Sequence, residues 1–533
     1  MRQAFLQRTK TILDNRLATF IIILLAVCCK SVIANAYTSL GGDKALYLLL
    51  AKGLLASGRM AEPVWMAETG ALQYLYEPAM HSPFYSLLAA PVLWLTNSYY
   101  WTQAILTVVS WVLFYGGLYA VAKIVFRHHW LTNLFLFCSA FFLYPHELSS
   151  TVKDTFGAGF TLVAIALMHR WLQQPQWQTT VLMALCLLSL SLTKLLYVPL
   201  AIVLVFLLLV FVLLQRSRQH LLFFCLLLLL LFAGGFLTNQ LLFAPAKELV
   251  LTAGLRLPAN TINMTVGFSP QNLLATFPFV SSSLINTHLW AVQLGSLPGF
   301  SFSLVMRSFL YIDAIVLVLL FVTSLYYSRQ LLSERFLLFP IMAAFTMTAV
   351  VVMLSLMGNV VQYKSTSALW TYVMDARSFL VPMLVLQLLL FRFLFLMRSL
   401  PLVRAALMLL FFLTIAHGIY FTAKETRLLV SGTKKRQGEN AFEKIAATLS
   451  QQDSTRQMLI TSDNFLRRYV QVNNLPAYAL ASLPAGFSWM QKGQRFLIAT
   501  YPEDSFYLQK FPPHQLQPLD SLPPFHLHSY QVK

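Results

Sequence analysis

Long apolar runs without charged residues dominate the chain. The run from Leu221 to Phe243, for example, contains no Lys, Arg, Asp or Glu. Such runs reach the roughly 20 residues that a helix needs to cross the hydrocarbon core of a bilayer. The pattern predicts about eleven transmembrane helices, near residues 17–34, 101–125, 130–145, 155–171, 179–193, 195–214, 221–243, 308–327, 336–357, 378–397 and 401–421.

Basic residues recur in alternate loops between these runs. With a cytoplasmic N-terminus, every loop predicted to lie inside carries positive charge, from Lys123, Arg127, Arg170, Arg216, Arg218, Arg329, Arg335, Arg392, Arg398 and Arg404. This distribution is typical of membrane proteins, whose cytoplasmic loops are rich in Lys and Arg. The segments predicted outside are 35–100, 146–154, 244–307 and 358–377. Because the number of spans is odd, the C-terminal region is expected outside as well.

Two apolar stretches need a separate interpretation. Basic residues precede the stretch 17–34, but no clean cleavage site follows it, so we interpret it as a retained signal anchor. The stretch from Pro83 to Thr96 is too short to cross a bilayer and begins with Ser-Pro, which favours a juxtamembrane or re-entrant helix.

The chain becomes polar after the last predicted span. This change divides it into a multi-span membrane domain, 1–424, and a small extracytoplasmic domain, 425–533. The second domain has a helical pattern at 441–449 and apolar strand patterns at 457–461 and 496–499, which together predict an α/β fold. It contains no Gly-rich phosphate loop and no GxSxG motif, so docking or handling of an acceptor is favoured over a second active site.

Composition and charge exclude several classes of protein. Hydrophobic residues make up 58% of the 533 positions and charged residues 11%, against about 25% charged in soluble domains. The net charge of +19 is scattered in ones and twos, which indicates membrane topology and not a nucleic-acid partner. All five cysteines fall inside apolar runs, so neither disulfides nor structural zinc are expected.

Acidic residues at the predicted outer boundary are the candidates for chemistry. Asp43 follows the first span and lies four residues before Tyr47, which places both on one face of a helix. Asp154 heads the fourth span. Either residue can equally be a helix N-cap, a position at which Asp is preferred.

Four motifs in chain order resemble the C-type (GT-C) membrane glycosyltransferases, including bacterial aminoarabinose transferases and protein O-mannosyltransferases. They are Asp43 with Tyr47, Ala51 and Ser57-Gly58 up to His81-Ser82-Pro83-Phe84-Tyr85; Asp154 in Thr-Val-Lys-Asp-Thr-Phe; Leu192-Thr193-Lys194; and Asp375-Ala376-Arg377 up to Pro382. The chain departs from the family at Asp43-Lys44, where many relatives have Asp-Glu. It also has His81-Ser82-Pro83 where a basic residue often precedes two prolines.

The resemblance implies a role for each of these residues. Asp43 would act as the general base toward the acceptor, with Asp154 as its catalytic partner, while Tyr47 and Tyr85 would bind substrate. The two carboxylates would suit Mg²⁺ or Mn²⁺, which prefer oxygen ligands, and a metal is therefore one option. No other cofactor is expected.

Three cations would bind the donor phosphate by the same resemblance: His81, Lys194 and Arg377. Each has a structural alternative. Lys194 can extend from a helix end toward the interface, Arg377 can pair with a loop carboxylate such as Asp375, and His81 can cap the helix after Pro83.

The hydrophobic pattern and the resemblance together predict an all-α polytopic membrane protein, GT-C-like, with a small C-terminal α/β domain. It would transfer a sugar from a polyprenyl-phosphate donor to a lipid, glycan or protein acceptor, with no nucleic-acid partner. The expected location is the bacterial inner membrane, in the cell envelope, with a periplasmic C-terminal domain. The alternatives are a transporter or flippase for an amphipathic lipid-linked substrate, which needs no general base, and a non-catalytic scaffold.

Overall fold

The chain forms two units. The computed structural model describes residues 11–37, 43–65, 72–76, 83–142, 152–194, 197–238, 240, 335–357, 380–396, 401–430, 437–451, 457–473, 475–479, 493–502, 508–509, 511–519, 522 and 525–532. The first unit comprises residues 1–37, 107–241 and 250–426. The second comprises residues 38–106, 242–249 and 427–533, so it joins part of the predicted first external loop to the polar C-terminal region.

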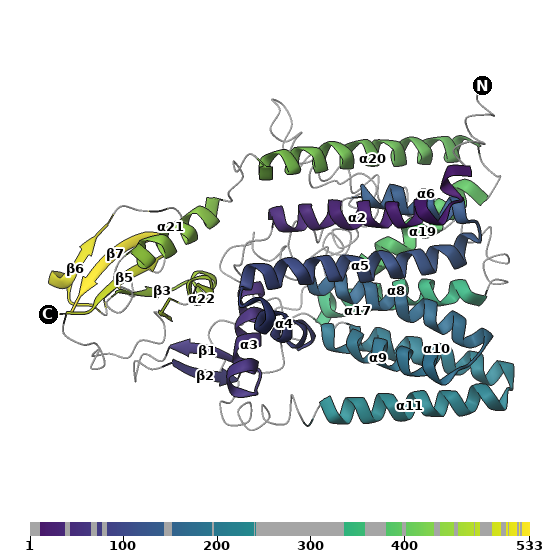
Figure 1. Ribbon diagram of the computed structural model, residues 1–533, viewed down its shortest axis with the longest axis horizontal. Coiled ribbons are helices and arrows are strands. Elements are labelled where there is room, and N and C mark those ends of the chain that lie inside the picture. Colours follow the sequence, from purple (N-terminus) through teal and green to yellow (C-terminus); the bar gives the residue numbers. More distant parts are fainter. Residues whose placement is uncertain are drawn as a thin grey trace. The chain divides into compact units, whose positions relative to one another are not determined.

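The first unit is built from long helices. They are α2 (Arg16–Tyr37), α5 (Tyr99–Phe126), α6 (His129–Ala140), α8 (Val152–Gln173), α9 (Trp177–Thr193), α10 (Tyr197–Gln215), α11 (Arg218–Thr238), α17 (Leu338–Met357), α19 (Leu380–Leu396) and α20 (Pro401–Val430). A short 3-10 helix, η3 (Arg335–Leu337), precedes α17. Helices α8, α9, α10 and α11 lie side by side (Figure 1). Ten predicted spans overlap these helices, and the one near 308–327 lies outside the described residues.

Several of these helices suit a bilayer. In the part of the chain that the structure describes, α2, α5, α8, α10 and α11 are long and apolar enough to span it. Large apolar side chains remain exposed on them, including Phe206 of α10 and Phe232 of α11. Soluble proteins rarely expose such surfaces, whereas lipid chains cover them readily. The chain is therefore an integral membrane protein, and its total of eleven spans stays a prediction.

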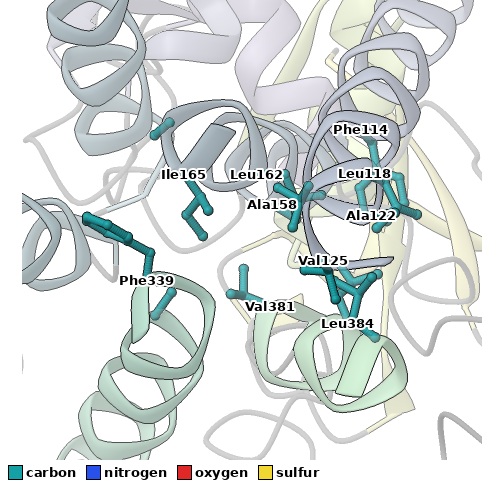
Figure 2. Packing of buried hydrophobic residues seen from close by; sticks show 14 of the residues in the cluster. Phe114, Leu118, Ala122, Val125, Ala158, Leu162, Ile165, Phe339, Val381 and Leu384 are labelled. Carbon is teal, nitrogen blue, oxygen red and sulfur yellow. The ribbon is translucent and has the colours of Figure 1, made fainter. Parts of the chain in front are cut away.

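The core of the first unit lies where α5, α8, α17 and α19 meet. Phe114, Leu118 and Val125 of α5 face this core together with Leu162 of α8 (Figure 2). Phe339 of α17 and Val381 and Leu384 of α19 belong to the same buried cluster, which also extends to α2, α6, α9, α10 and α11. The sequence places apolar residues on all sides of these helices, and packing selects which of them are covered.

Lys30 is a charged residue buried inside the first predicted span. Its side chain is 0% exposed, and its ammonium group donates a hydrogen bond to the main-chain oxygen of Phe142, just after α6. A charged group in an apolar helix is costly unless polar partners surround it. The carbonyl at the end of α6 supplies one such partner, so the α2–α6 contact accommodates this lysine.

Basic and polar residues cluster at one end of the first unit. Arg392 of α19 donates a hydrogen bond to the main-chain oxygen of Val125, at the end of α5. His220, near the start of α11, lies 3.2 Å from the main-chain oxygen of Leu172 on α8. These contacts satisfy carbonyls that a helix end leaves without partners. The distribution of Lys and Arg among the loops predicts that this end is cytoplasmic.

The second unit combines helices with two sheets. Its first part contains α3 (Asp43–Ser57), β1 (Ala61–Trp65), β2 (Leu72–Tyr76) and α4 (Phe84–Thr96). Its last part contains α21 (Gln437–Gln451), β3 (Gln457–Thr461), α22 (Asn464–Val472), β4 (Ala477–Ala479), β5 (Arg495–Thr500), η7 (Pro513–Gln515), β6 (Leu516–Pro518) and β7 (His526–Gln531). The helices expected at 83–96 and 441–449 and the strands expected at 457–461 and 496–499 are confirmed. The antiparallel β1–β2 pair was not predicted, because Ala, Glu and Pro in β1 are uncommon in strands.

The C-terminal sheet has five strands in the order β4-β3-β5-β7-β6. Strand β3 is parallel to β4 and β5, while β7 is antiparallel to β5 and β6. Since adjacent residues in a strand point to opposite faces, two cores form. Leu459 and Leu497 pack with the helices α21 and α22, whereas Ile460 and Phe496 pack on the other face. The small α/β domain expected from the sequence is thus present.

Candidate active site

The candidate site in the first unit centres on an ion pair between Asp154 and Lys194. Asp154 lies in the first turn of α8, and Lys194 directly follows α9. The Lys194 ammonium nitrogen lies 3.2 Å from Oδ1 of Asp154, and the side chains are 32% and 2% exposed, respectively. A buried carboxylate therefore pairs with a lysine whose side chain remains partly exposed.

Helix dipoles stabilise both charges where they lie. A negative side chain is favoured at the N-terminus of a helix, as Asp154 is on α8, and a positive one at the C-terminus, as Lys194 is on α9. The pair thus has a structural reason to exist besides any catalytic one. It differs from an ordinary surface ion pair in the almost complete burial of its acid.

Tyr197 brings a third helix to the pair. Its hydroxyl at the start of α10 donates a hydrogen bond to the main-chain oxygen of Asp154 over 3.5 Å, and its side chain is 1% exposed. Gly157 makes this approach possible. A Cβ atom at this position would lie 2.2 Å from Cε2 of the Tyr197 ring. The ends of α8, α9 and α10 therefore converge on the Asp154–Lys194 pair.

Three of the predicted site residues cannot be placed at the level of side chains. Asp43 is the first residue of α3, so the helix expected after it is confirmed, but its side chain lies outside the described part. His81 and Arg377 lie outside the described residues, as does Asp375. The roles of Asp43 as base or N-cap, and of His81 and Arg377 as phosphate ligands, stay predictions.

Tyr47 and Tyr85 lie together in the second unit. Their ring centroids are 5.6 Å apart with an interplanar angle of 60°, and each side chain is 2% exposed. The hydroxyl of Tyr85 donates a hydrogen bond to Oε1 of Gln103 on α5. The two tyrosines thus join α3 and α4 to residues 99–106 at the start of α5, which belong to the second unit. Their role in substrate binding stays a prediction.

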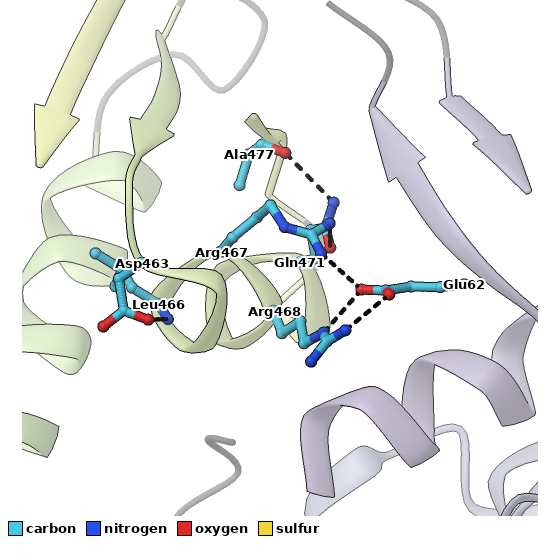
Figure 3. Close-up of polar contacts among 7 residues, drawn as sticks. All are labelled: Glu62, Asp463, Leu466, Arg467, Arg468, Gln471 and Ala477. Carbon is cyan, nitrogen blue, oxygen red and sulfur yellow. Dashed lines mark hydrogen bonds and ion pairs between the residues drawn. The ribbon is translucent and has the colours of Figure 1, made fainter. Parts of the chain in front are cut away.

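An unpredicted cluster of charges lies elsewhere in the second unit (Figure 3). Glu62 of β1 is 2% exposed and accepts hydrogen bonds from Arg467 and Arg468 of α22. Sequence reasoning missed it because the Arg-Arg pair is typical of a solvated helix face. Nothing in the sequence connects it with an acid about 400 positions earlier.

The described residues do not form a divalent-cation site by themselves. Among them, no group of three or more His, Cys, Asp or Glu side chains is arranged to hold a metal. Asp154 contributes one carboxylate, and the Lys194 ammonium beside its Oδ1 atom competes with a cation there. Asp43 was the second ligand expected, and its side chain is not described. A metal site would require oxygen ligands beyond those described.

Comparisons with known proteins complete these observations. No protein-family model and no curated protein matches the chain. The chain is similar to two crystal structures of ArnT from Cupriavidus metallidurans, one in the apo state and one bound to undecaprenyl phosphate. Each comparison aligns 96% of this chain with 97% of that chain at 13% identity, with TM-scores of 0.41 and 0.43, respectively. A likeness of this size assigns no substrate and no residue role here.

Proposed function

We propose that the protein is a membrane glycosyltransferase that moves a sugar from a polyprenyl-phosphate donor to a lipid, glycan or protein acceptor on the extracytoplasmic face. The four ordered motifs in the sequence support the reaction class. The observation that carries the proposal is the Asp154–Lys194 pair, in which a buried carboxylate holds a partly exposed lysine side chain at the ends of apolar helices.

The reaction requires a base and a positive environment for the leaving group. Asp43 accepts the proton from the acceptor nucleophile, whose oxygen or nitrogen then attacks the anomeric carbon of the sugar. The bond between that carbon and the phosphate oxygen breaks with inversion of configuration. The lipid phosphate leaves with the electron pair, and cations stabilise the charge that grows on it. Lys194, His81 and Arg377 are the proposed cations.

Asp154 has a supporting role in this scheme. The lysine side chain has many rotamers, and fixing it in one of them costs conformational entropy. The contact with the buried Asp154 carboxylate restrains the ammonium group before a donor arrives. The exposed part of Lys194 remains available to phosphate oxygens. The acid thereby orients the cation.

Sugar transfer in membranes tests the proposal. Membranes that contain wild-type protein, Asp43→Asn, Asp154→Asn or Lys194→Gln are supplied with a panel of radiolabelled polyprenyl-phosphate sugars. Asp14→Asn and Lys424→Gln are matched controls, since both side chains are exposed. We expect transfer by wild type and both controls, and a large loss in the three site variants at equal expression.

Two outcomes would contradict the proposal. Absence of transfer with every donor would favour the transporter alternative, which flipping of the same labelled lipids across proteoliposomes would reveal. Transfer that is equal in wild type and Asp43→Asn would remove Asp43 as the base and require another acid.

A further inference from the structure

We propose that the C-terminal domain positions the first external segment of the chain, with Arg467 and Arg468 as positioning residues for α3. They act through Glu62 of β1, and α3 begins at Asp43. The inference rests on the proposed function only in giving Asp43 a catalytic role. Glu62, Arg467 and Arg468 touch neither donor nor acceptor in this scheme.

The contact between α22 and β1 is geometrically specific. Nε and Nη2 of Arg468 donate to Oε1 and Oε2 of Glu62 over 3.0 and 3.1 Å, while Nη2 of Arg467 donates to Oε1 over 3.0 Å (Figure 3). Paired hydrogen bonds from one guanidinium to both oxygens of a carboxylate fix orientation as well as distance. The two arginines thus hold Glu62 in one pose.

A further set of contacts holds Arg467 itself. Its Nη1 donates to Oε1 of Gln471 over 3.2 Å, and Nε2 of Gln471 donates to the main-chain oxygen of Ala477 over 3.3 Å. Ala477 begins β4 of the C-terminal sheet. The position of Glu62 therefore depends on the folded sheet, through a chain of hydrogen bonds.

Strand β1 and helix α3 pack directly against each other through their backbones. Glu62 follows Ala61, whose carbonyl oxygen would lie only 1.8 Å from a Cβ atom placed on Gly53 of α3. Glycine is needed at this position because any side chain would push the strand away. A movement of Glu62 is therefore transmitted to the middle of α3.

A second contact reaches the start of α3. Ala45 and Leu49 pack with Val472 of α22 in a small buried cluster. Ala45 is two residues after Asp43, which corresponds to a rise of about 3 Å along a helix. Helix α22 thus contacts α3 both near the proposed base and, through Glu62, farther along the helix.

The electrostatics make this arrangement depend on both partners. Glu62 is 2% exposed, and the side chains of Arg467 and Arg468 are 7% and 14% exposed. A buried carboxylate whose charge is less compensated is favoured to move toward water or to take up a proton. In either case, β1 loses its fixed position against α22. The expected consequence is a less ordered α3, with an intact helical bundle in the first unit.

Full-length protein in lipid nanodiscs tests the inference with variants Glu62→Gln, Arg467→Gln and Arg468→Gln. Arg495→Gln is the matched control, because Arg495 is an exposed arginine of the same domain. Hydrogen–deuterium exchange is measured for peptides covering 43–65 and, as an internal reference, 152–173. Values of kcat and donor KM are measured for sugar transfer in parallel.

We expect amide exchange in 43–65 to accelerate about tenfold or more in the three variants, with 152–173 unchanged. We expect kcat to fall by up to about 100-fold, because a small displacement of a catalytic group can cause a loss of this size. Donor KM should change little. The Arg495→Gln control should resemble wild type. Unchanged exchange in 43–65 of a folded Glu62→Gln variant would overturn the inference.

Lysine variants keep the test decisive if the glutamine variants fail to fold. Arg467 uses one donor on Glu62, whereas Arg468 uses two. Lysine cannot reproduce a bidentate contact, so Arg467→Lys should preserve protection of 43–65 better than Arg468→Lys. Equal behaviour of the two variants would contradict the proposed geometry. Absence of transfer by wild type would refute the proposed function, and the exchange data would still decide the positioning contact.

Discussion

The Lys194 ammonium nitrogen lies 3.2 Å from Oδ1 of Asp154, and only the lysine is accessible to solvent. The two partners therefore respond differently to replacement. Lys194→Met leaves a buried carboxylate without this charged partner, and we expect a loss of about 1.5–3 kcal/mol in the free energy of unfolding. Asp154→Asn leaves an ammonium that can extend toward water, so its stability loss should be smaller.

The corresponding measurement is thermal unfolding in detergent micelles for the two single variants and the double variant. We expect the double variant to be more stable than Lys194→Met alone, because Asn at position 154 no longer buries a charge that has lost its ammonium partner. Strictly additive losses would show that the two side chains do not interact. The proposed function further predicts that Asp154→Asn loses transfer despite its near-normal stability.

Gly157→Ala should disturb the same site by steric means. The added Cβ atom would lie 2.2 Å from Cε2 of the buried Tyr197 ring, so the start of α10 must move away from α8. Overpacking of this kind costs about 1–3 kcal/mol. Gly116→Ala in α5 is the control, because a Cβ atom there meets nothing within 4 Å. A melting temperature that is lowered for Gly157→Ala and unchanged or raised for Gly116→Ala is the expected result.

Tyr85→Phe separates the structural role of Tyr85 from its predicted role in substrate binding. The variant loses the buried hydrogen bond to Gln103 but keeps the ring contact with Tyr47. We expect a stability loss of about 0.5–1.5 kcal/mol. Tyr100→Phe, at a tyrosine that is 61% exposed, is the control and should change nothing. KM is then measured at a temperature below the onset of unfolding. A rise in donor or acceptor KM would indicate that Tyr85 contacts substrate. An unchanged KM would show that Tyr85 contributes only to packing.

His528 of β7 should make the C-terminal domain sensitive to acid. Burial, and secondly the charge of His526, lowers the pKa of His528 below its usual 6.5. The unfolded chain then binds a proton at higher pH than the folded one, so stability falls as pH drops below about 6.5, down to the folded-state pKa. His528→Gln should flatten this dependence, whereas His514→Gln, at an exposed histidine, should not.

Proteolysis of the full-length protein at about pH 5.5 and about pH 7.5, on either side of the usual histidine pKa, measures this effect. We expect cleavage within 457–532 to be faster for wild type at the lower pH, after correction for protease activity. The same acceleration in His528→Gln would show that another group is responsible.

The hydrophobic pattern by itself determined the helical, membrane-embedded character of the chain. An apolar run such as the one in α10 forms a helix in lipid, because its backbone groups have no water to bind and must form hydrogen bonds with one another. The same local logic predicted β3, where a short apolar run of five residues specifies a strand. It also predicted a helix that begins near Asp154, since an acid is favoured close to a helix N-terminus. Helix α8 begins at Val152, so Asp154 lies in its first turn and not at the N-cap.

Tertiary structure alone decided which distant side chains meet. Lys194 was expected at a helix end, but only the packing of α8 against α9 shows that it pairs with Asp154. Glu62 had no distinguishing sequence feature, and its partners Arg467 and Arg468 come from another part of the chain. The reason is physical. Helix and strand periodicity reflect forces between near neighbours, whereas an ion pair across hundreds of residues depends on the packing of whole elements, which no local pattern encodes.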